Sequence, residues 1–301
     1  MPAPPIYVET SIDTSLDILW EHTQTPDIHE RWDLRFSSIT YLPRSSPDQP
    51  QQFLYRTNIG FGLGVEGKGE AVGSFSSEAS RSSALKFWSD GIGLITEGSG
   101  YWKYDVEGSS VRFLTQYDYR TRFGVLGRWF DRLYFRPLLG WATAWSFDSL
   151  RLWLEQGIDP TLARWKAAIH ACARLLLGFI WIYQGVFPKL LYPHAGERQI
   201  LQETGLFPGV EGQVLFGLGL AEVMFGLLFF VLWRSKAMFV ANNLALVVLT
   251  VGALLGDLRI FVAPFNPVTL NTAMLVTAML GWFSATNLPS ASRCLRQSSS
   301  Q

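Results

Sequence analysis

Residues 167–187 read AAIHACARLLLGFIWIYQGVF, and apolar stretches of similar length follow at 214–233, 237–255 and 268–283. A helix of ~20 apolar residues is long enough to cross a hydrocarbon core of ~30 Å. The sequence therefore predicts an all-α bundle of four transmembrane helices in the second half of the chain.

The composition of the whole chain averages two different halves. Of 301 residues, 48% are hydrophobic and 17% charged, and the formal net charge is zero, which argues against a nucleic-acid-binding surface or an acidic tail. The two cysteines, Cys172 and Cys294, fit neither a disulfide framework nor a metal cluster. The opening MPAPPIYVETS lacks the basic and apolar regions of a cleavable signal, so we do not expect the first domain to be secreted.

Basic residues near the apolar stretches predict the orientation in the membrane. One side carries Arg164, Lys166, Arg234, Lys236, Arg293 and Arg296. The other side carries Lys189, Arg198 and Arg259 together with Glu197, Glu203, Glu211 and Asp257. Because Lys and Arg near helix ends are retained in the cytoplasm, we expect a multi-pass protein of the cell membrane with both termini cytoplasmic.

Residues 1–160 show a different pattern, with short alternating segments separated by glycine and serine. IYVETSI predicts a strand, and a short helix with Leu16, Leu19 and Trp20 follows, capped by Asp13 or Ser15. The next segments are rich in aromatic and β-branched residues and predict about six antiparallel strands. Residues 126–154 return to helical spacing, which predicts a long closing helix, bent or broken at Pro137.

The stretches VETSIDTSLDILWEHTQTPDIHERWD (8–33) and FGVLGRWFDRLYFRPLLGWATAWSFDSLRLWLE (123–155) resemble START-like domains, the SRPBCC superfamily, of the polyketide cyclase/dehydrase type. The resemblance covers nearly all of residues 5–157. It implies an α+β helix-grip fold, in which the sheet curls round the closing helix and leaves an apolar cavity for lipids, sterols or polyketides.

The second half resembles the DoxX-like membrane proteins from about Trp165 to Asn287. The matching segments are RLLLGFIWIYQGVFPKL (174–190), with Gln184, Gly185 and Lys189, then GLAEVMFG (219–226) and FNPVTLNTAML (265–275). This resemblance implies a four-helix bundle, and some members are associated with quinone-linked sulfur oxidation or redox defence. We therefore expect a START-like domain over residues 1–160 and a DoxX-like domain over 161–301.

Polar residues inside apolar helices are the sharpest functional signal, because a charge near the bilayer centre costs at least ~2.5 kcal/mol and needs a partner. The predicted polar site of the membrane domain consists of His170, Arg174, Gln184, Glu222 and Asn271. His170 and Arg174, four residues apart, share a helix face, and we expect Arg174 to pair with Glu222. Three interpretations stay open: a structural link between helices, a pocket that binds a quinone-like head group or moves protons, and contact of Glu222 with water or lipid head groups.

Other small and polar residues of the membrane half favour helix packing. Glycines recur at positions 178, 185, 217, 219 and 226, a spacing that lets helices approach closely. Asn242 and Asn243 are expected to form hydrogen bonds between helices.

In the first half, the G-x-G-x-x-G spacing at Gly62, Gly64 and Gly67 continues as a strand, so it is not expected to be a dinucleotide fingerprint. The acidic and histidine residues of the first helical region are interpreted as a solvated surface rather than a metal site: His22, Asp27, His29, Glu30 and Asp33. Candidates for contact with a ligand in the cavity are Arg56, Glu70, Lys86, Tyr101, Tyr117 and Tyr119, and no catalytic residue is assigned.

Five tryptophans lie on the closing helix and the junction: Trp129, Trp141, Trp145, Trp153 and Trp165. Core packing is expected to explain most of them. The alternative is that part of the helix rests on the membrane surface, with indoles at head-group depth and arginines on anionic lipid.

Three hypotheses for function follow. In the first, the START-like domain captures a lipid, a quinone or a polyketide-like molecule and presents it to the membrane domain through the short linker QGIDPTLAR. The second is a quinone-linked membrane oxidoreductase subunit, with quinone as its cofactor and Arg174 and Glu222 at its site. The third is a structural or assembly module without a ligand. Expected partners are the lipid bilayer and a hydrophobic small molecule, with a redox partner or a second copy of the chain left open.

Overall fold

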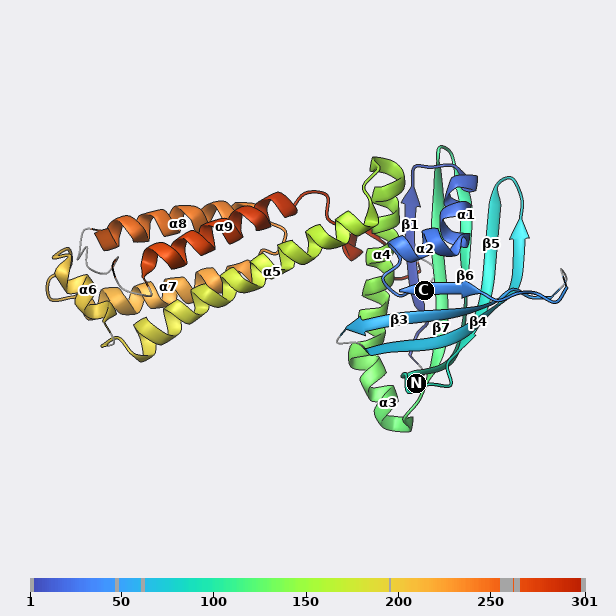
Figure 1. Cartoon of the computed structure of the whole chain (residues 1–301), viewed down its shortest axis with the longest axis horizontal. Helices are drawn as coiled ribbons and strands as arrows, with labels where there is room; N and C mark the ends of the chain where they lie inside the picture. Colours follow the sequence, from blue (N-terminus) through green and yellow to red (C-terminus); the bar gives the residue numbers. More distant parts are fainter. Residues whose placement is uncertain are drawn as a thin grey trace. The chain divides into compact units, whose positions relative to one another are not determined.

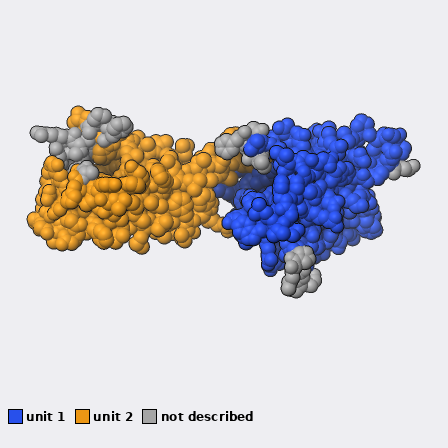
Figure 2. Space-filling view, turned by 90° about the horizontal axis from the view of Figure 1, so that it is seen from below, with its two compact units in different colours: residues 1–163, 287–301 blue, residues 164–286 orange. Residues whose placement is uncertain are grey.

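The computed structural model describes residues 3–46, 49–60, 63–194, 196–254, 262 and 266–298. They form two compact units, coloured separately in Figure 2. Unit 1 comprises residues 1–163 and 287–301, and unit 2 comprises residues 164–286. The last residues of the chain, grouped with the membrane half on sequence, therefore belong to unit 1.

Unit 1 is built on a seven-stranded antiparallel sheet with the strand order β1-β7-β6-β5-β4-β3-β2 (Figure 1). Its strands are β1 (Ile6–Ile12), β2 (Ser38–Tyr41), β3 (Gln52–Gly60), β4 (Leu63–Ser76), β5 (Ser80–Trp88), β6 (Ile95–Glu107) and β7 (Ser110–Thr121). Two short helices, α1 (Leu16–Gln24) and α2 (Pro26–Trp32), separate β1 from β2. This order and the long helix after β7 confirm the expected helix-grip fold.

Local sequence sets the ends of the helices. The side chain of Ser15 accepts a hydrogen bond from the Ile18 amide and so caps α1. The closing helix runs without a break through α3 (Gly124–Phe130), a π-helical turn η1 (Asp131–Phe135) and α4 (Arg136–Gln156). The irregularity lies just before Pro137, whose missing N–H removes one backbone hydrogen bond from this continuous helix.

The core of unit 1 lies between α4 and the inner face of the sheet. Phe147 of α4 stacks on Phe113 of β7 with ring centroids 4.3 Å apart. Trp32, at the end of α2, and Trp102 complete a cluster of buried rings around them. Side chains therefore fill the part of the interior that α4 covers.

The C-terminal tail closes unit 1. Glu9 of β1 and Leu295 exchange two backbone hydrogen bonds of 2.9 Å, so the tail adds a short pairing to the edge of the sheet. The carboxylate of Asp148, fully buried in α4, accepts hydrogen bonds from the Ser290 amide at 2.7 Å and from Arg293 at 3.0 Å. The backbone pairing and the buried acid hold the tail together with two bonds to carbonyl oxygens of α4, from Cys294 to Ala144 and from Arg296 to Pro137, both at 3.2 Å.

Unit 2 is helical. It comprises most of α5 (Pro160–Gly185), a π-helical turn η2 (Val186–Leu191), α6 (Glu197–Glu203), α7 (Glu211–Val231), α8 (Ala237–Leu254) and α9 (Pro267–Ser284). Two stretches, Pro160–Leu191 and Glu211–Val231, are long and apolar enough to cross a membrane, and α8 contains a shorter apolar helix. The predicted residues Asp257, Arg259 and Gly62 lie outside the described residues.

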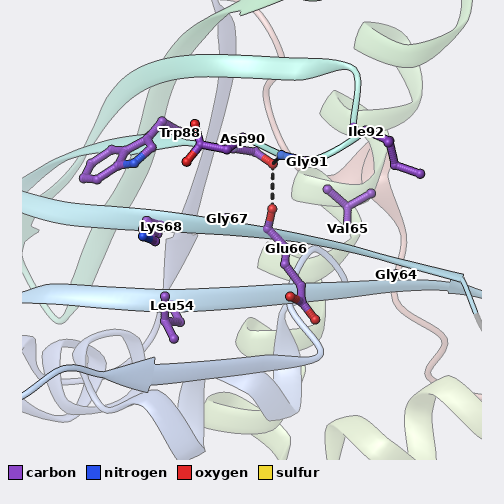
Figure 3. A pocket seen from close by; sticks show the side chains of 12 residues that line it. Leu54, Gly64, Val65, Glu66, Gly67, Lys68, Trp88, Asp90, Gly91 and Ile92 are labelled. Atoms are coloured by element: carbon purple, nitrogen blue, oxygen red, sulfur yellow. Dashed lines mark hydrogen bonds between the residues drawn. The ribbon is translucent and has the colours of Figure 1, made fainter.

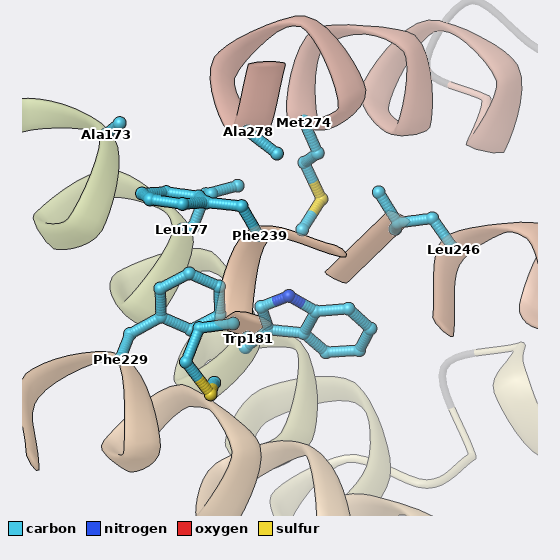
Figure 4. Packing of buried hydrophobic residues seen from close by; sticks show 9 residues of the cluster. Ala173, Leu177, Trp181, Phe229, Phe239, Leu246, Met274 and Ala278 are labelled. Atoms are coloured by element: carbon cyan, nitrogen blue, oxygen red, sulfur yellow. The ribbon is translucent and has the colours of Figure 1, made fainter. Parts of the chain in front are cut away.

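A core of buried apolar side chains joins the helices of unit 2 (Figure 4). Phe229 of α7 and Phe239 of α8 are almost fully buried and contact each other edge to face. Leu177 and Trp181 of α5 and Met274 of α9 pack into the same cluster. Every long helix of the unit contributes to this core.

Glycines set the approach of α5 to α7. A Cβ atom on Gly185 would lie 2.5 Å from the carbonyl oxygen of Gly219, and one on Gly226 would lie 2.7 Å from the carbonyl oxygen of Gly178. Backbone therefore packs on backbone at both points, which confirms the prediction for these four glycines. Gly217, by contrast, has no neighbour within 4 Å of such an atom.

Candidate functional site

A buried ionic network lies at the end of α2, where the sequence predicted a solvated surface. Asp33 is fully buried, and its carboxylate accepts hydrogen bonds from Arg35 at 2.6 Å and from His29 at 3.0 Å. Burial alone would raise the pKa of Asp33, but the charge of Arg35 and the hydrogen bonds from His29 and Arg35 hold it well below its usual range. The prediction was wrong for His29 and Asp33, because the chain turns inward here beside the rings of Trp32 and Trp102.

Three aromatic side chains mark a second part of the inner face, on strands β3 and β5. Phe53, Tyr55 and Phe87 are only half-buried. Each ring lies over a glycine of the neighbouring strand, and a Cβ atom there would overlap it: Phe53 over Gly69, Tyr55 over Gly67 and Phe87 over Gly98. The glycines therefore let the rings lie flat against the sheet. Gly67 therefore makes room for the ring of Tyr55.

The strand register separates the six ligand-contact candidates. Tyr117 and Tyr119 belong to the inner face, where their hydroxyls bond to Thr143 at 2.8 Å and to Asp131 at 2.6 Å. The other four lie in register rows that alternate with those inner residues, so they face away from α4: Arg56, Glu70, Lys86 and Tyr101. Those four predictions were wrong, because a strand presents successive side chains to opposite faces and its register is not readable from sequence.

An open groove of about 340 Å³ lies on β3, β4 and the loop after β5 (Figure 3). Leu54, Lys68 and Trp88 form a cross-strand row along it. The Ser89 hydroxyl donates to the carbonyl oxygen of Glu66 at 2.6 Å and holds the loop against the sheet. Because this row alternates with the inner residues, the groove is on the face opposite α4 and is not the cavity implied by the resemblance.

In unit 2, Arg174 has a structural environment that the sequence did not reveal. It is fully buried, and its guanidinium donates to the carbonyl oxygens of Phe229 at 3.3 Å, Leu232 at 3.0 Å and Ser235. These carbonyl groups lie in the last turn of α7 or just after it, where the end of a helix leaves carbonyl groups without an intrahelical partner. The ring of Phe239 lies 4.6 Å from the guanidinium carbon. Arg174 therefore caps the C-terminal end of α7 from α5.

His170 lies one turn before Arg174 and is also buried. Its Nε2 lies 3.1 Å from the carbonyl oxygen of Trp233, and its Nδ1 lies 3.3 Å from that of Gly281. A neutral imidazole donates to only one of two such acceptors. The residue links the ends of α7 and α9.

Glu222 pairs with Lys189 and not with Arg174. Lys189 Nζ lies 3.0 Å from the Glu222 carboxylate and 3.7 Å from that of Glu197, and it donates to the carbonyl oxygen of Gln184 at 3.5 Å. The predicted Arg174–Glu222 pair was wrong for a geometric reason. Because Gly178 faces Gly226 in antiparallel helices, Arg174 lies level with the end of α7, about 12 Å along the axis from Glu222.

The amides of α8 and α9 bind neighbouring helices, as expected for Asn242. Its Oδ1 accepts from Trp181 Nε1 at 2.8 Å, and its Nδ2 donates to Asn243 at 3.1 Å. Asn271 donates to the Thr250 hydroxyl at 2.8 Å. His170 and Arg174 therefore lie together at the end of α7, whereas Glu222 and Asn271 have other partners, and the contact given for Gln184 is that of its backbone carbonyl oxygen with Lys189.

The tryptophans of the closing helix divide by burial. Trp145 is 7% exposed, whereas Trp129 is 56%, Trp141 44% and Trp165 66% exposed. The expectation that core packing explains most of them was wrong, since these three indoles are largely outside the core.

Comparison with known proteins shows which family the chain belongs to. It is 56% identical over 184 residues to the uncharacterized membrane protein YndG of Bacillus subtilis, a match that covers 60% of this chain and 68% of YndG. The chain belongs to the YndG family. Within this YndG-family chain, residues 178–279 match the model of the DoxX-like family. The DoxX-like resemblance read from the sequence is confirmed over that range.

The fold of unit 1 is similar to solved structures at low sequence identity. A STAR-related lipid transfer protein from Xanthomonas axonopodis is 12% identical, with a TM-score of 0.39, and the match covers 50% of the YndG-family chain and 85% of that protein. A START superfamily protein from Mycobacterium smegmatis is 12% identical with the same TM-score, covering 52% and 100%.

Three groups in this YndG-family protein were missed on sequence. Lys189 was named as a flanking charge and as part of the DoxX-like segment but was given no partner, and Asp148 was not considered, although both are buried and paired. Phe53, Tyr55 and Phe87 were hidden among other strand aromatics. One sequence pattern could have indicated them. Glycines two residues apart, as in GVEGKGEAVG, leave room on the sheet for aromatic rings of the neighbouring strands.

Proposed function

We propose that unit 1 binds an apolar molecule against the rings of Phe53, Tyr55 and Phe87, and that unit 2 holds the protein in the membrane. The observation that carries the proposal is the placement of these rings. They belong to the inner face of the sheet, yet they are half-buried, in contrast to the closely packed cluster under α4. Large apolar surface that stays partly exposed in a folded domain is typical of a binding surface.

The glycines support this assignment. Because the rings lie over Gly67, Gly69 and Gly98, where a side chain would overlap them, they lie closer to the sheet than they could over any other residue. The bilayer is the natural source of an apolar ligand for a chain of this family, and only Gly157, Ile158 and Asp159 separate α4 from α5. Such a short connection keeps exchange between the sheet and the membrane nearly intramolecular. A lipid, a quinone or a polyketide-like molecule meets these requirements.

Native mass spectrometry of the full chain in detergent, followed by extraction of bound molecules, tests the proposal. Tyr55→Ala and Phe87→Ala should each weaken binding, because loss of about 2 kcal/mol of apolar burial corresponds to an affinity about 30-fold lower. Leu54→Ala, on the opposite face of the same strand, is the matched control and should bind normally. A wild-type protein that retains no apolar molecule and takes up none from added lipids or quinones would refute the proposal.

We further propose that α5, α7, α8 and α9 each cross the membrane, with unit 1 in the cytoplasm. The tail supports an even number of crossings, because Leu295 and Arg293 bind unit 1 and so lie on its side of the bilayer. The basic residues Arg234 and Lys236, between α7 and α8, fit the same side.

Cysteine accessibility tests this topology. In a background without native cysteines, Glu203→Cys should react with a membrane-impermeant maleimide in intact cells, because α6 lies between the first two crossings. Gln297→Cys in the tail should react only after the cells are permeabilised. Equal reaction of both positions in intact cells would exclude the arrangement.

The quinone-linked oxidoreductase hypothesis gains no support from the geometry. It assumed that Arg174 and Glu222 face one pocket, but each has other partners at a different depth. The ligand-binding proposal is therefore the one that the described contacts favour.

A further inference from the structure

A continuous row of exposed apolar side chains runs along α3, η1 and the start of α4. The row, called here the apolar stripe, consists of Leu126, Trp129, Phe130, Leu133, Leu138 and Trp141. Their exposed fractions range from 44% at Trp141 to 72% at Leu126. In the closing helix of a water-soluble domain, such residues would be expected to face the core.

The π-helical turn keeps the apolar stripe on one side of the helix. A regular helix turns about 100° per residue, so Leu138 would lie about 120° from Leu126 around the axis. The extra residue in the turn Asp131–Phe135 removes about 100° of this difference and realigns the two side chains. The irregularity therefore extends the row past Pro137 into α4.

The opposite side of the helix fixes the direction of the apolar stripe. Asp131 is 4% exposed and accepts hydrogen bonds from Tyr119 at 2.6 Å and Arg136 at 3.0 Å. Gly127 is also buried, and a Cβ atom there would overlap the carbonyl oxygen of Arg122. These contacts hold the helix on unit 1 by its polar side and leave the apolar side outward.

The charges beside the apolar stripe are positive. Arg128 and Arg132 are exposed between its members, whereas the acid of this segment, Asp131, is buried and paired. Interleaved arginine, tryptophan and leucine are typical of helices that lie in the interface of an anionic membrane. Trp129 and Trp141 have the amphipathic rings that prefer the head-group level. Two copies of this surface facing each other would bring their arginines together, which disfavours self-association.

We propose that the apolar stripe binds the surface of the bilayer as an interfacial helix, with its apolar side chains among the acyl chains and Arg128 and Arg132 on anionic head groups. The chain itself brings a bilayer to this domain, since only three residues separate α4 from α5, which is long and apolar enough to cross a membrane. This binding does not depend on a ligand of the sheet. It attaches unit 1 directly to the bilayer, in addition to the covalent connection of unit 1 to unit 2.

The test uses the full chain in lipid nanodiscs. A fluorescent label that responds to polarity is placed at Leu133→Cys in the apolar stripe or at Val72→Cys in β4, in a background without native cysteines. Leu133 is 49% and Val72 46% exposed, so the pair is matched in type and exposure. Nanodiscs contain phosphatidylcholine with or without phosphatidylserine, and in each case with or without brominated acyl chains, which quench on contact.

The label at position 133 should be blue-shifted and severalfold more strongly quenched by brominated lipid than the label at position 72. Replacing Arg128 and Arg132 by serine should reduce that quenching in nanodiscs that contain phosphatidylserine. Equal, weak quenching at both positions would overturn the proposal. A blue-shifted label at 133 that brominated lipid does not quench would also overturn it, and would identify a protein partner or a second copy as the occupant.

Discussion

Asp33 is the residue on which the inner end of α2 depends. We expect Asp33→Asn to destabilise the protein by about 3 kcal/mol at neutral pH, because it leaves the charge of Arg35 buried without its partner. Asp27→Asn, an exposed change in the same helix, should have little effect. Thermal unfolding of the full chain, followed by tryptophan fluorescence, measures the difference.

The difference in stability between wild type and Asp33→Asn should decrease at low pH. The pKa of Asp33 is lower in the folded protein than its ordinary value of about 3.9, so the ionised carboxylate stabilises the fold above that pH. The stabilisation is lost as the pH falls below about 4, and the curves of wild type and Asp33→Asn should approach each other. A difference that stays constant down to pH about 3 would show that the carboxylate charge is not its source.

Residue-level partners were the least predictable part of the chain. Arg174 was expected to find a carboxylate, but its partners are backbone carbonyl groups, which every residue carries and no sequence pattern marks. Glu222 was expected to pair with Arg174, yet its partner Lys189 comes from the π-helical turn after α5. Both outcomes depend on the depth at which α5 and α7 face each other.

At the scale of elements, the packing of α5 on α7 offers a matched test. Gly185→Ala should destabilise the helical unit, because its Cβ would lie 2.5 Å from the carbonyl oxygen of Gly219. Gly217→Ala in α7 has open space and should be neutral or stabilising by up to about 1 kcal/mol, since alanine is the better helix former. Thermal stability in detergent distinguishes them, and equal effects would contradict the packing described.

The elements themselves were largely predictable. Alternation in IYVETSI and the aromatic and β-branched residues of the later segments predicted the seven strands, and Ser15 was among the two caps expected for α1. The π-helical turn was not predictable, because it depends on the hydrogen bonds of Asp131 with Tyr119 and Arg136 in the folded domain. The inward direction of Tyr55 and the outward direction of Arg56 depend on register, which a period of two leaves undecided.

At the scale of the whole molecule, the tail makes a prediction for Cys294. Burial and the nearby charge of Asp148 raise the pKa of this thiol to about 12, so its reactive thiolate is rare near neutral pH. In a Cys172→Ala background, alkylation of Cys294 should be slow and should accelerate in Arg293→Ala, which removes one of the bonds that hold the tail on Asp148. Gln297→Ala, an exposed change beyond the contact, is the control. Fast alkylation of the parent would contradict a closed tail.

The return of the tail to unit 1 could not be foreseen from sequence. The segment ASRCLRQ has neither the length of a strand nor the spacing of a helix, and the residues that hold it are almost 300 positions away or lie in α4. Its pairing with Glu9 depends on where α9 ends, which is a property of the complete fold.

Synthesis of the protein has an order that follows from this tail. The sheet and α4 leave the ribosome before unit 2 and can fold early, whereas Ser290, Arg293 and Leu295 emerge only after all the described helices of unit 2. Until then the edge of β1 lacks its last partner, and Asp148 lacks two of its donors. A chain that stops within the helical half keeps an open strand edge and an underpaired buried acid, features that favour aggregation and proteolysis. Completion of the first domain thus waits until the segment that follows the helical half has been made.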